Sequence, residues 1–459
     1  MSNIKFSHMH DILDGRNHEY PFYGNILLIG TSVDGPTLTP RRIYSVNEAF
    51  KEYGDGELVV GCYEALHSGA ESVSVIRIAG TPATTTLLNT ESNPCIELTT
   101  ISSGVRYNQW RAVVDDTHVR ILNETNDVMR SYLRADYMTI GQLAMRITLD
   151  GTLMSHMLKA KAVNSAQPLS SLMTGTYDFM GGSNGQNITP QERATHLKLA
   201  YDNVLNSMID VDIIVPLRAH PDGGNLAFRD DLLKACRERS MIGYGTIGIL
   251  SLNNPQHPVD MKTTDGRYIS VVGMRPVIYK NRMNNAYLET LNAEEYVSSG
   301  EAIYAGMLSN ILLDQYIDNK PIPIIRDQAN LSEAQINHLD RLGYTTLRRS
   351  TTRGYVITKG RTLDTKKAMQ SVYGVRLGIY IENMIRRQLD VYIGYPMPQI
   401  YEIEDKLGKF MEELTSTQAI RHYSFDVSLS TDTVNIDLEF VPTHSIDVIH
   451  ASLRLITRR

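Results

Sequence analysis

Two glycine-rich stretches match short sequence motifs that bind ligands or act in catalysis in other proteins. Residues 243–248 match GxGxxG, in which a strand precedes and a helix follows, so that a dinucleotide pyrophosphate meets the helix N-terminus. The order predicted here is the reverse, a helix before and a strand after, which favours an ordinary turn. Residues 181–185 match GxSxG, where a helix must begin at the serine to present its hydroxyl as a nucleophile. The next predicted helix begins only at Pro190, so we interpret this stretch as a flexible crossover.

Other residue types that bind metals or react are too few or too far apart to form a site. His8, His10 and Asp11 could supply three metal ligands, but no further ligand follows at the spacing of a metal site. The cysteines lack metal-ligand or CxxC spacing, which predicts reduced thiols. They are Cys62, Cys95 and Cys236. We therefore predict no catalytic residue, no metal site and no cofactor.

The composition excludes several classes of protein. The chain has 459 residues, of which 42% are hydrophobic and 21% charged, so it can bury a large core divided over about three domains. Its net charge of -6, with both signs interspersed, argues against nucleic acid as a partner. No apolar run approaches the ~20 residues of a membrane span, and the N-terminus lacks a signal pattern. We expect no direct membrane insertion.

Residues 24–84 predict the first half of an α/β core. Residues 25–30 are almost continuously apolar, as in a strand that is covered on both faces. Ser45 and Glu48 form a capping box for a helix that ends near Tyr53, before Gly54. A second helix follows, and residues 72–78 alternate as a strand. Together these elements predict a strand, two helices and a second strand.

Residues 177–330 predict the second half of this core. Thr189 and Glu192 mark the start of a helix, with a proline in its first turn. A buried strand at 211–217, a helix at 229–239 and a strand at 245–251 follow. This alternation predicts a mostly parallel sheet, and hence an α/β (α+β) multidomain chain with a mixed-sheet core.

Residues 85–176 have a different composition and predict an inserted β-rich domain. We expect strands at 95–101, 110–116 and 118–122. The alternating segment MRITL at 145–149 predicts a further strand, and Asp150-Gly151 after it predicts a turn.

Residues 331–445 predict a C-terminal α+β domain. Ser332 and Gln335 form a second capping box. Long helices are expected over 365–392 and 403–420, followed by a hairpin of strands at 423–429 and 433–441. Two extended arms, 1–23 and 446–459, flank the domains. Alternation in the last arm predicts a strand.

The order and the amino-acid sequences of these elements resemble those of contractile-tail sheath proteins, the subunits that surround the tails of phages and phage-like injection machines. The matching segments cover most of the chain outside the insertion. They include VSVIRIAG, FMGGSNGQN before a helix, VDIIVP, LSEAQINHLDRLGYTTL and VNIDLEFVPTHSIDVIHASLRL. One departure is at Leu250-Ser251, where the family has an aspartate-proline pair.

The resemblance implies a structural function without an active site. Such a subunit polymerises helically around a tail tube and shortens to drive the tube through a cell envelope. The implied partners are further copies in hexameric rings, the tail tube protein, and the baseplate and tail terminator proteins. The implied location is the virion tail, assembled in the host cytoplasm. The C-terminal domain is expected inside against the tube, and the insertion outside.

The resemblance also implies that both arms link neighbouring subunits. We hypothesise that the contacts come from Ile4, Phe6, Ile449, Leu453 and Leu455. With equal weight, the last strand could instead complete the sheet of its own subunit.

The resemblance implies that the glycines of the crossover, Gly181, Gly182 and Gly185, form the hinge through which the insertion rejoins the core.

Two alternatives to a sheath subunit stay open. They are an α/β enzyme that uses the glycine-rich loops, and a non-contractile phage structural protein.

Overall fold

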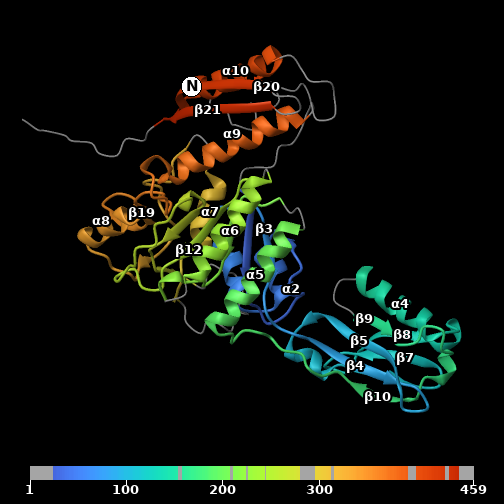
Figure 1. The fold of residues 1–459 in the computed structure, drawn as a ribbon. Coiled ribbons are helices and arrows are strands. Elements are labelled where there is room, and N and C mark those ends of the chain that lie inside the picture. The colour runs from blue at the N-terminus through green and yellow to red at the C-terminus, as the bar shows by residue number, and fades with distance from the viewer. Residues whose placement is uncertain are drawn as a thin grey trace, which may run out of the picture.

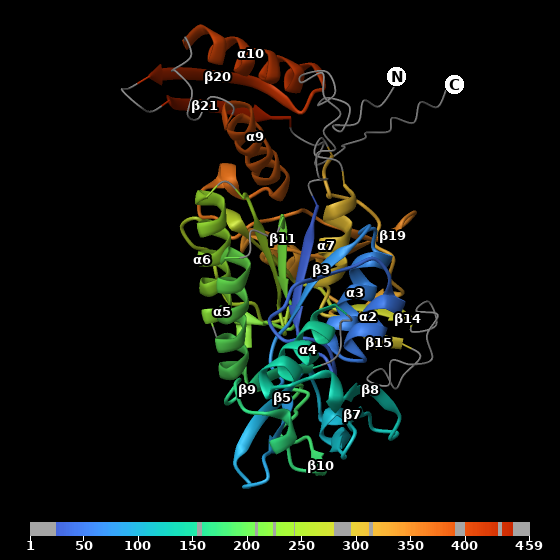
Figure 2. The same ribbon diagram turned by 90° about the vertical axis from the view of Figure 1, so that its right-hand side faces the viewer.

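The computed structural model describes residues 24–153, 158–206, 210–223, 226–242, 244–279, 295–311, 315–390, 400–429 and 434–443. These residues form three groups of elements (Figures 1 and 2). A central group surrounds a large sheet. A β-rich group, built from the insertion, lies at one end of it, and two long helices with a hairpin lie at the other.

The central sheet has seven strands in the order β17-β13-β12-β11-β1-β3-β2. They are β1 (Ile26–Gly30), β2 (Arg41–Ile43), β3 (Val73–Arg77), β11 (Ile213–Pro216), β12 (Ile247–Ser251), β13 (Ile269–Val272) and β17 (Tyr344–Thr345). All pairs are parallel except β2 with β3. The central strands are buried along their whole length, which explains their unbroken apolar sequences. The predicted α/β core is confirmed.

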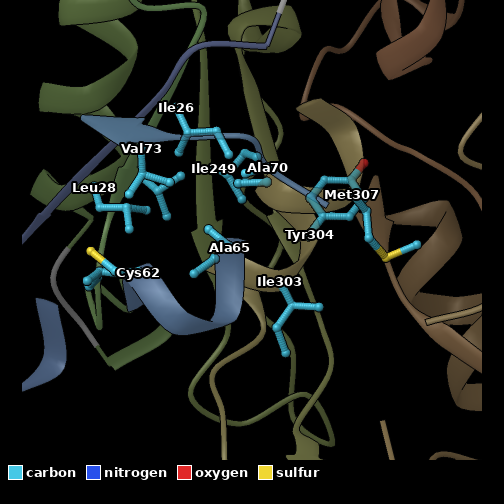
Figure 3. Close-up of a cluster of buried hydrophobic side chains, with 14 of the residues drawn as sticks. Ile26, Leu28, Cys62, Ala65, Ala70, Val73, Ile249, Ile303, Tyr304 and Met307 are labelled. Carbon is cyan, nitrogen blue, oxygen red and sulfur yellow. The ribbon is translucent and has the colours of Figure 1, made fainter. Parts of the chain in front are cut away.

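Helices cover both faces of this sheet. One face packs against α2 (Val46–Tyr53), α3 (Glu57–His67) and α7 (Glu301–Asn310), and the other against α5 (Pro190–Asn206), α6 (Ala227–Met241) and α8 (Glu333–Arg341). Successive side chains of β1 alternate between the two faces: Ile26 and Leu28 join the first cluster, which Figure 3 shows, and Leu27 joins the second.

The helix starts follow the local signals in the sequence. The hydroxyl of Ser45 accepts the N–H of Glu48 at 3.2 Å, although the Glu48 carboxylate accepts the N–H of Tyr44 and not that of Ser45. Ser332 and Gln335 form the complete capping box that was predicted. The caps at Ser45 and Ser332 are confirmed, but the reciprocal bond of a capping box is present only at Ser332. Such hydrogen bonds join residues at most four apart, so they depend little on the rest of the fold.

The insertion forms two antiparallel sheets and one helix around its own apolar cluster. The sheet β10-β6-β7-β8 contains β6 (Arg111–Val114), β7 (His118–Leu122), β8 (Val128–Leu133) and β10 (Gly175–Asp178). The sheet β4-β5-β9 contains β4 (Pro82–Leu88), β5 (Pro94–Ser103) and β9 (Leu158–Ala162). The sheets therefore extend over 82–178, slightly beyond the 85–176 expected from composition.

The strand predicted at 145–149 is wrong, because these residues lie in helix α4 (Ile140–Leu153). Ile140, Leu143 and Ile147 are buried at helical spacing against the insertion's cluster, whereas Met145 is 74% exposed. The alternation that suggested a strand mixed residues from both faces of the helix. The turn expected at Asp150-Gly151 is wrong for the same reason, since α4 continues through it.

The C-terminal group contains α9 (Val372–Asp390), α10 (Ile400–Ser416), β20 (Ile420–Leu429) and β21 (Val434–Pro442). Helix α9 begins at Val372 and not at 365, because a 3-10 turn over Lys367–Met369 precedes it. Helix α10 ends at Ser416, before Gln418 with its positive φ of 63°, so Ile420 starts the hairpin.

The boundary expected at residue 331 differs from the packing. Strand β17 pairs with β13 at the edge of the central sheet, and Tyr344 and Leu363 lie in the cluster on one of its faces. Leu347, Ile357 and Val372 lie in the cluster on the other face. A strand of two residues carries no periodicity, so the sequence offered no signal for it.

Short strands complete the central group. They are β14 (Pro276–Tyr279), β15 (Glu295–Val297) and β16 (Arg326–Asp327) in one sheet, and β18 (Leu347–Ser350) with β19 (Gly354–Ile357) in another.

Two helical glycines give a matched test of this packing. A Cβ at Gly306 in α7 would collide with the backbone of Ala65 in α3, whereas one at Gly374 in α9 would meet the ring of Pro442 at an ordinary 3.7 Å. We expect Gly306→Ala to lower the free energy of unfolding by about 1–3 kcal/mol through overpacking. Gly374→Ala should raise it by about 0.5–1 kcal/mol. Denaturant titration measures both, and equal effects would contradict the α3–α7 contact.

Candidate functional site: arm roots, hairpin and domain crossing

The carboxyl ends of β1 and β11 are the place where an α/β enzyme would bind a ligand. The chain runs on from β1 to β2 and β3 on one side of the sheet, and from β11 to β12 on the other side. In this protein the carboxylate of Glu57 lies at that position. It accepts the N–H of Thr31 at 2.7 Å, and the guanidinium of Arg193 binds both its oxygens at 2.7 and 3.1 Å. Both side chains are largely buried. The position is thus occupied by an internal ion pair.

The two motif-like stretches have the order of elements that the sequence predicted. Helix α6 ends at Met241 and β12 begins at Ile247, so the GxGxxG letters lie between a helix and the strand that follows. After the GxSxG letters, α5 begins only at Pro190. Neither arrangement places a helix N-terminus at the glycine-rich turn.

The cysteines are buried and poorly suited to nucleophilic chemistry. Burial raises the pKa of the Cys95 thiol to about 11 and that of Cys236 to about 12, and it raises the pKa of Cys62 further. Within the described ranges no group of three or more His, Cys, Asp and Glu side chains could hold a metal ion. None of the described helices is long and apolar enough to cross a membrane.

A carboxyl group is sealed between α3 and the segment before α7. Glu64 is 6% exposed, and its Oε1 accepts the hydroxyl of Tyr296 at 3.2 Å. Burial raises the pKa of Glu64 to about 8, helped by the nearby carboxylate of Glu301 and opposed by hydrogen bonds and by Arg218. Glu301 itself accepts the backbone N–H of Arg218 at 3.0 Å. The group is closed to substrates, so its effect is on stability.

The N-terminal arm is anchored where it joins the core. The carboxylate of Asp212 accepts the backbone N–H groups of Gly24 and Asn25 at 2.8 and 3.0 Å, and Asp210 accepts the side-chain amide of Asn25 at 3.0 Å. Burial raises the pKa of Asp212 to about 7, while the two N–H bonds oppose this shift. A Cβ at Gly24 would lie 2.7 Å from the carbonyl oxygen of Ser309. The root of the arm therefore has a fixed direction.

The root of the C-terminal arm is anchored in a similar way. At the end of β21, the N–H of Thr443 donates to the carbonyl of Ala419 at 3.1 Å, and the hydroxyl of Tyr316 donates to the carbonyl of Thr443. Tyr316 stacks on Tyr373 of α9, with ring centroids 3.9 Å apart. The predicted arm contacts lie outside the described residues. They are Ile4, Phe6, Ile449, Leu453 and Leu455.

The hairpin β20–β21 forms a sheet of its own. Its strands have 10 and 9 residues, and among the described residues no further strand pairs with either outer edge. One face packs on α9 and α10 with a mixture of buried and half-buried apolar side chains. These are Val427, Tyr423, Phe425, Ile436, Leu438 and Phe440. The sheet thus presents two long edges with hydrogen-bonding groups and an apolar face that is only partly covered.

The chain crosses twice between the core and the insertion, and backbone hydrogen bonds join the two crossings. Thr81 and Ser183 exchange backbone hydrogen bonds of 3.2 and 3.0 Å, and Thr84 and Met180 exchange bonds of 2.8 and 2.9 Å. They form a short two-stranded connection that includes the start of β4.

The three glycines expected as a hinge lie in this connection, but two of them are tightly packed. The backbone of Gly182 both donates to and accepts from the side-chain amide of Asn108, at 2.7 and 3.0 Å, and a Cβ there would collide with Gly104. A Cβ at Gly185 would collide with the backbone of Gly80. Only Gly181 has open space around it. Two of the three glycines thus lie in a packed junction, and Gly181 is the least restrained of them.

The buried carboxyl of Glu64 predicts how stability depends on pH. Its folded-state pKa of about 8 lies above the 4.5 of an unperturbed glutamate, so the folded protein binds the proton more tightly than the unfolded chain. The free energy of unfolding should fall as pH rises from about 4.5 to about 8, and Asp212 should add a fall in the same direction. Glu64→Gln should flatten the profile measured by denaturant titration. The exposed control Glu402→Gln should not, and parallel profiles for Glu64→Gln and wild type would contradict the assignment.

No protein-family model and no curated protein sequence matches the chain. Solved structures match it over nearly its whole length. The sheath tail protein from Desulfitobacterium hafniense is 16% identical, with a TM-score of 0.58 over 94% of this chain and 96% of that chain. The sheath tail protein from Listeria innocua is 14% identical, with a TM-score of 0.61 over 92% of each chain.

A third match is a protein in an assembled state, the helical sheath of the anti-feeding prophage after contraction. It is 10% identical, with a TM-score of 0.54 over 94% of this chain and 92% of that chain. These matches include the core, the insertion and the C-terminal group together. The chain therefore has the fold of contractile-tail sheath proteins.

Proposed function

We propose that this chain is the structural subunit of a contractile sheath, which polymerises helically around a tail tube and shortens to drive the tube through a cell envelope. The fold match supports the general class of protein. The observation that carries the proposal in this chain is the hairpin β20–β21, a long two-stranded sheet with open edges, which stands between anchored arm roots.

The hairpin is suited to receive a strand from another subunit. Two-stranded sheets are marginal by themselves, and the half-buried apolar face of this one gains cover when a further strand is added. Main-chain hydrogen bonds along the edge would hold the added strand, while alternate side chains fill the apolar face. In the last arm Ile449, Leu453 and Leu455 occupy one side of such a strand by their spacing.

A strand donated from one subunit to the next makes a head-to-tail contact, and repeated contacts of this kind generate a helix rather than a closed pair. Six copies in each ring is our proposal for this lattice. The other proposed partners are the tail tube protein inside it, the baseplate at one end and a tail terminator protein at the other. The proposed location is the tail of a virion or phage-like device, assembled in the host cytoplasm.

Contraction in this proposal uses no cofactor and no catalytic residue. The extended lattice is metastable, and subunits that rotate about their arm contacts bury more surface in the contracted lattice. We propose that the C-terminal group faces the tube and the insertion faces outward. The anchored roots at Gly24 and Thr443 would keep each arm attached in a set direction during this movement.

A non-contractile structural protein of a phage particle is the second candidate. It would also use the edges of the hairpin and need no catalytic residue, but its assemblies would have a single length. Electron microscopy of the purified chain, alone and with the cognate tube protein, separates the two. Striated hollow tubes that occur in a long and a short form support the sheath, and tubes of one length support the second candidate.

Removal of the last arm should abolish assembly. We expect a chain truncated after residue 445 to stay a folded, soluble monomer, because the arm contributes to the neighbour's sheet and not to its own core. Sedimentation velocity and electron microscopy measure the outcome. Tubes from the truncated chain would overturn the arm hypothesis, and an unfolded monomer would show that the arm completes its own sheet.

Two double substitutions test which side of the arm makes the contact. Leu453→Asp with Leu455→Asp places charge on the side predicted to be buried, and His450→Asp with Ser452→Asp places it on the opposite side. The first pair should raise the critical concentration for tubes by about 100-fold or more, since each buried leucine contributes roughly 1.5–3 kcal/mol. The second pair should change it little. Equal effects of the two pairs would contradict a strand with one buried side.

A further inference from the structure

Arg77, the last residue of β3, is a fully buried cation whose hydrogen-bond acceptors are backbone carbonyls. Its side chain is 0% exposed. One terminal nitrogen, Nη1, donates to the carbonyl of Gly35 at 2.6 Å and to that of Ser103 at 2.7 Å. The other, Nη2, donates to the carbonyl of Asn184 at 2.9 Å. A planar guanidinium can bridge several acceptors at once in fixed directions, which a lysine cannot.

These three carbonyls belong to three different parts of the chain. Gly35 lies in the core loop after β1, Ser103 ends β5 in the insertion, and Asn184 lies in the returning crossing. Arg77 itself ends the core strand from which the chain departs. One side chain therefore holds together the core, the insertion and the return path.

A second set of contacts joins the same parts around Arg77. The carboxylate of Asp34, in the core loop, accepts the hydroxyl of Tyr107 at 2.8 Å and pairs with Arg106, and both partners lie in the insertion. This carboxylate supplies negative charge near the buried guanidinium. Burial lowers the pKa of Arg77 to about 10, so the group stays charged at neutral pH.

The surrounding glycines leave the space that this arrangement needs. A Cβ at Gly80, whose φ is 90°, would lie 2.6 Å from Nη2 of Arg77. A Cβ at Gly185 would collide with Gly80 from the opposite crossing. Both crossings approach the guanidinium more closely than a residue with a side chain allows.

We propose that Arg77 is a positioning residue that sets the orientation of the insertion relative to the core, so that the two move together when the lattice shortens. The part about shortening rests on the proposed sheath function. The part about orientation does not, and it holds for the isolated subunit. Any bending between core and insertion would have to break hydrogen bonds to a buried cation. Breaking such bonds costs more free energy than breaking hydrogen bonds between neutral groups.

The orientation is tested on the isolated full chain by electron–electron double resonance. Spin labels are placed at Leu199→Cys on α5 and at Met145→Cys on α4, both exposed, while the native cysteines are buried. We expect one narrow distance distribution. A broad or two-peaked distribution in this otherwise wild-type chain overturns the proposal.

Substitution of Arg77 identifies the cause of that orientation. Arg77→Met in the labelled chain should widen the distribution roughly twofold, because three buried carbonyls lose their donor, and Arg77→Lys should give an intermediate width. Arg111→Met, which removes a half-exposed arginine paired with Asp178, is the control and should leave the width unchanged. A second label pair inside the insertion, Met145→Cys with Val128→Cys, shows whether that domain stays folded. An unchanged width in folded Arg77→Met overturns the proposal.

Joint movement during contraction is tested by locking the crossings together. Thr81 and Ser183 exchange backbone hydrogen bonds, a pairing that places Cα atoms about 5.5 Å apart, within disulfide range. Sheaths of Thr81→Cys with Ser183→Cys should contract to the same length oxidised or reduced. Oxidised sheaths that stay long while reduced ones shorten overturn the proposal. If wild-type chains form no contractile tubes, the sheath function fails, and the distance measurement still decides the role of Arg77.

Discussion

The structure depends on a polar junction between the core and a domain inserted into it. The chain leaves the central sheet after β3, builds two further sheets and returns before α5, so that two crossings must be held side by side. Apolar packing is poorly suited to this task because the crossings expose their backbone groups. The guanidinium of Arg77 binds the carbonyl of Asn184 in the returning crossing together with those of Gly35 in the core and Ser103 in the insertion, and the carboxylate of Asp34 binds Tyr107 and Arg106 of the insertion. The junction is fixed by donors and acceptors whose geometry allows little adjustment.

The core resembles that of many α/β enzymes, but the ionisable groups that lie in it contact other groups of the protein itself. Glu57 and Arg193 pair at the position where the sheet would receive a ligand, and Glu64 lies sealed near Glu301. Such groups keep their partners only while the surrounding helices stay closed. This use of charge favours one packing of the helices over alternatives, as the proposed sheath function requires of a subunit that moves as a rigid unit.

Assembly in our proposal depends on the opposite end of the molecule. There no other strand of the described residues pairs with the two-stranded sheet β20–β21, and both arm roots are anchored by hydrogen bonds to residues of the core or the C-terminal group. In our proposal, anchored roots that lead into linking arms separate two requirements. The subunit stays stiff, while the connection between subunits can change its angle without losing its strand pairing.

Local signals in the sequence were sufficient for the elements that depend on local physics. The buried strands at 26–30 and 213–216 follow from continuous apolar runs, and the starts of α2, α5 and α8 follow from capping residues within four positions. The order of these elements also determined the α/β class of the core. The resemblance to sheath proteins added the overall plan, which the fold comparison supports along nearly the whole chain.

Tertiary structure decided whatever depended on partners distant in sequence. Helix α4 is a helix because the sheet of the insertion buries Ile140, Leu143 and Ile147, although residues 145–149 alternate like a strand. Strand β17 joins the core through pairing with β13. A strand of two residues has no periodicity from which it could be predicted. The role of Arg77 was also invisible, because its acceptors at 35, 103 and 184 meet only when the chain has folded. The sequence by itself determined the core elements that have local signals and their order, and packing between distant segments decided the helical state of α4, the pairing of β17 and how the domains are joined.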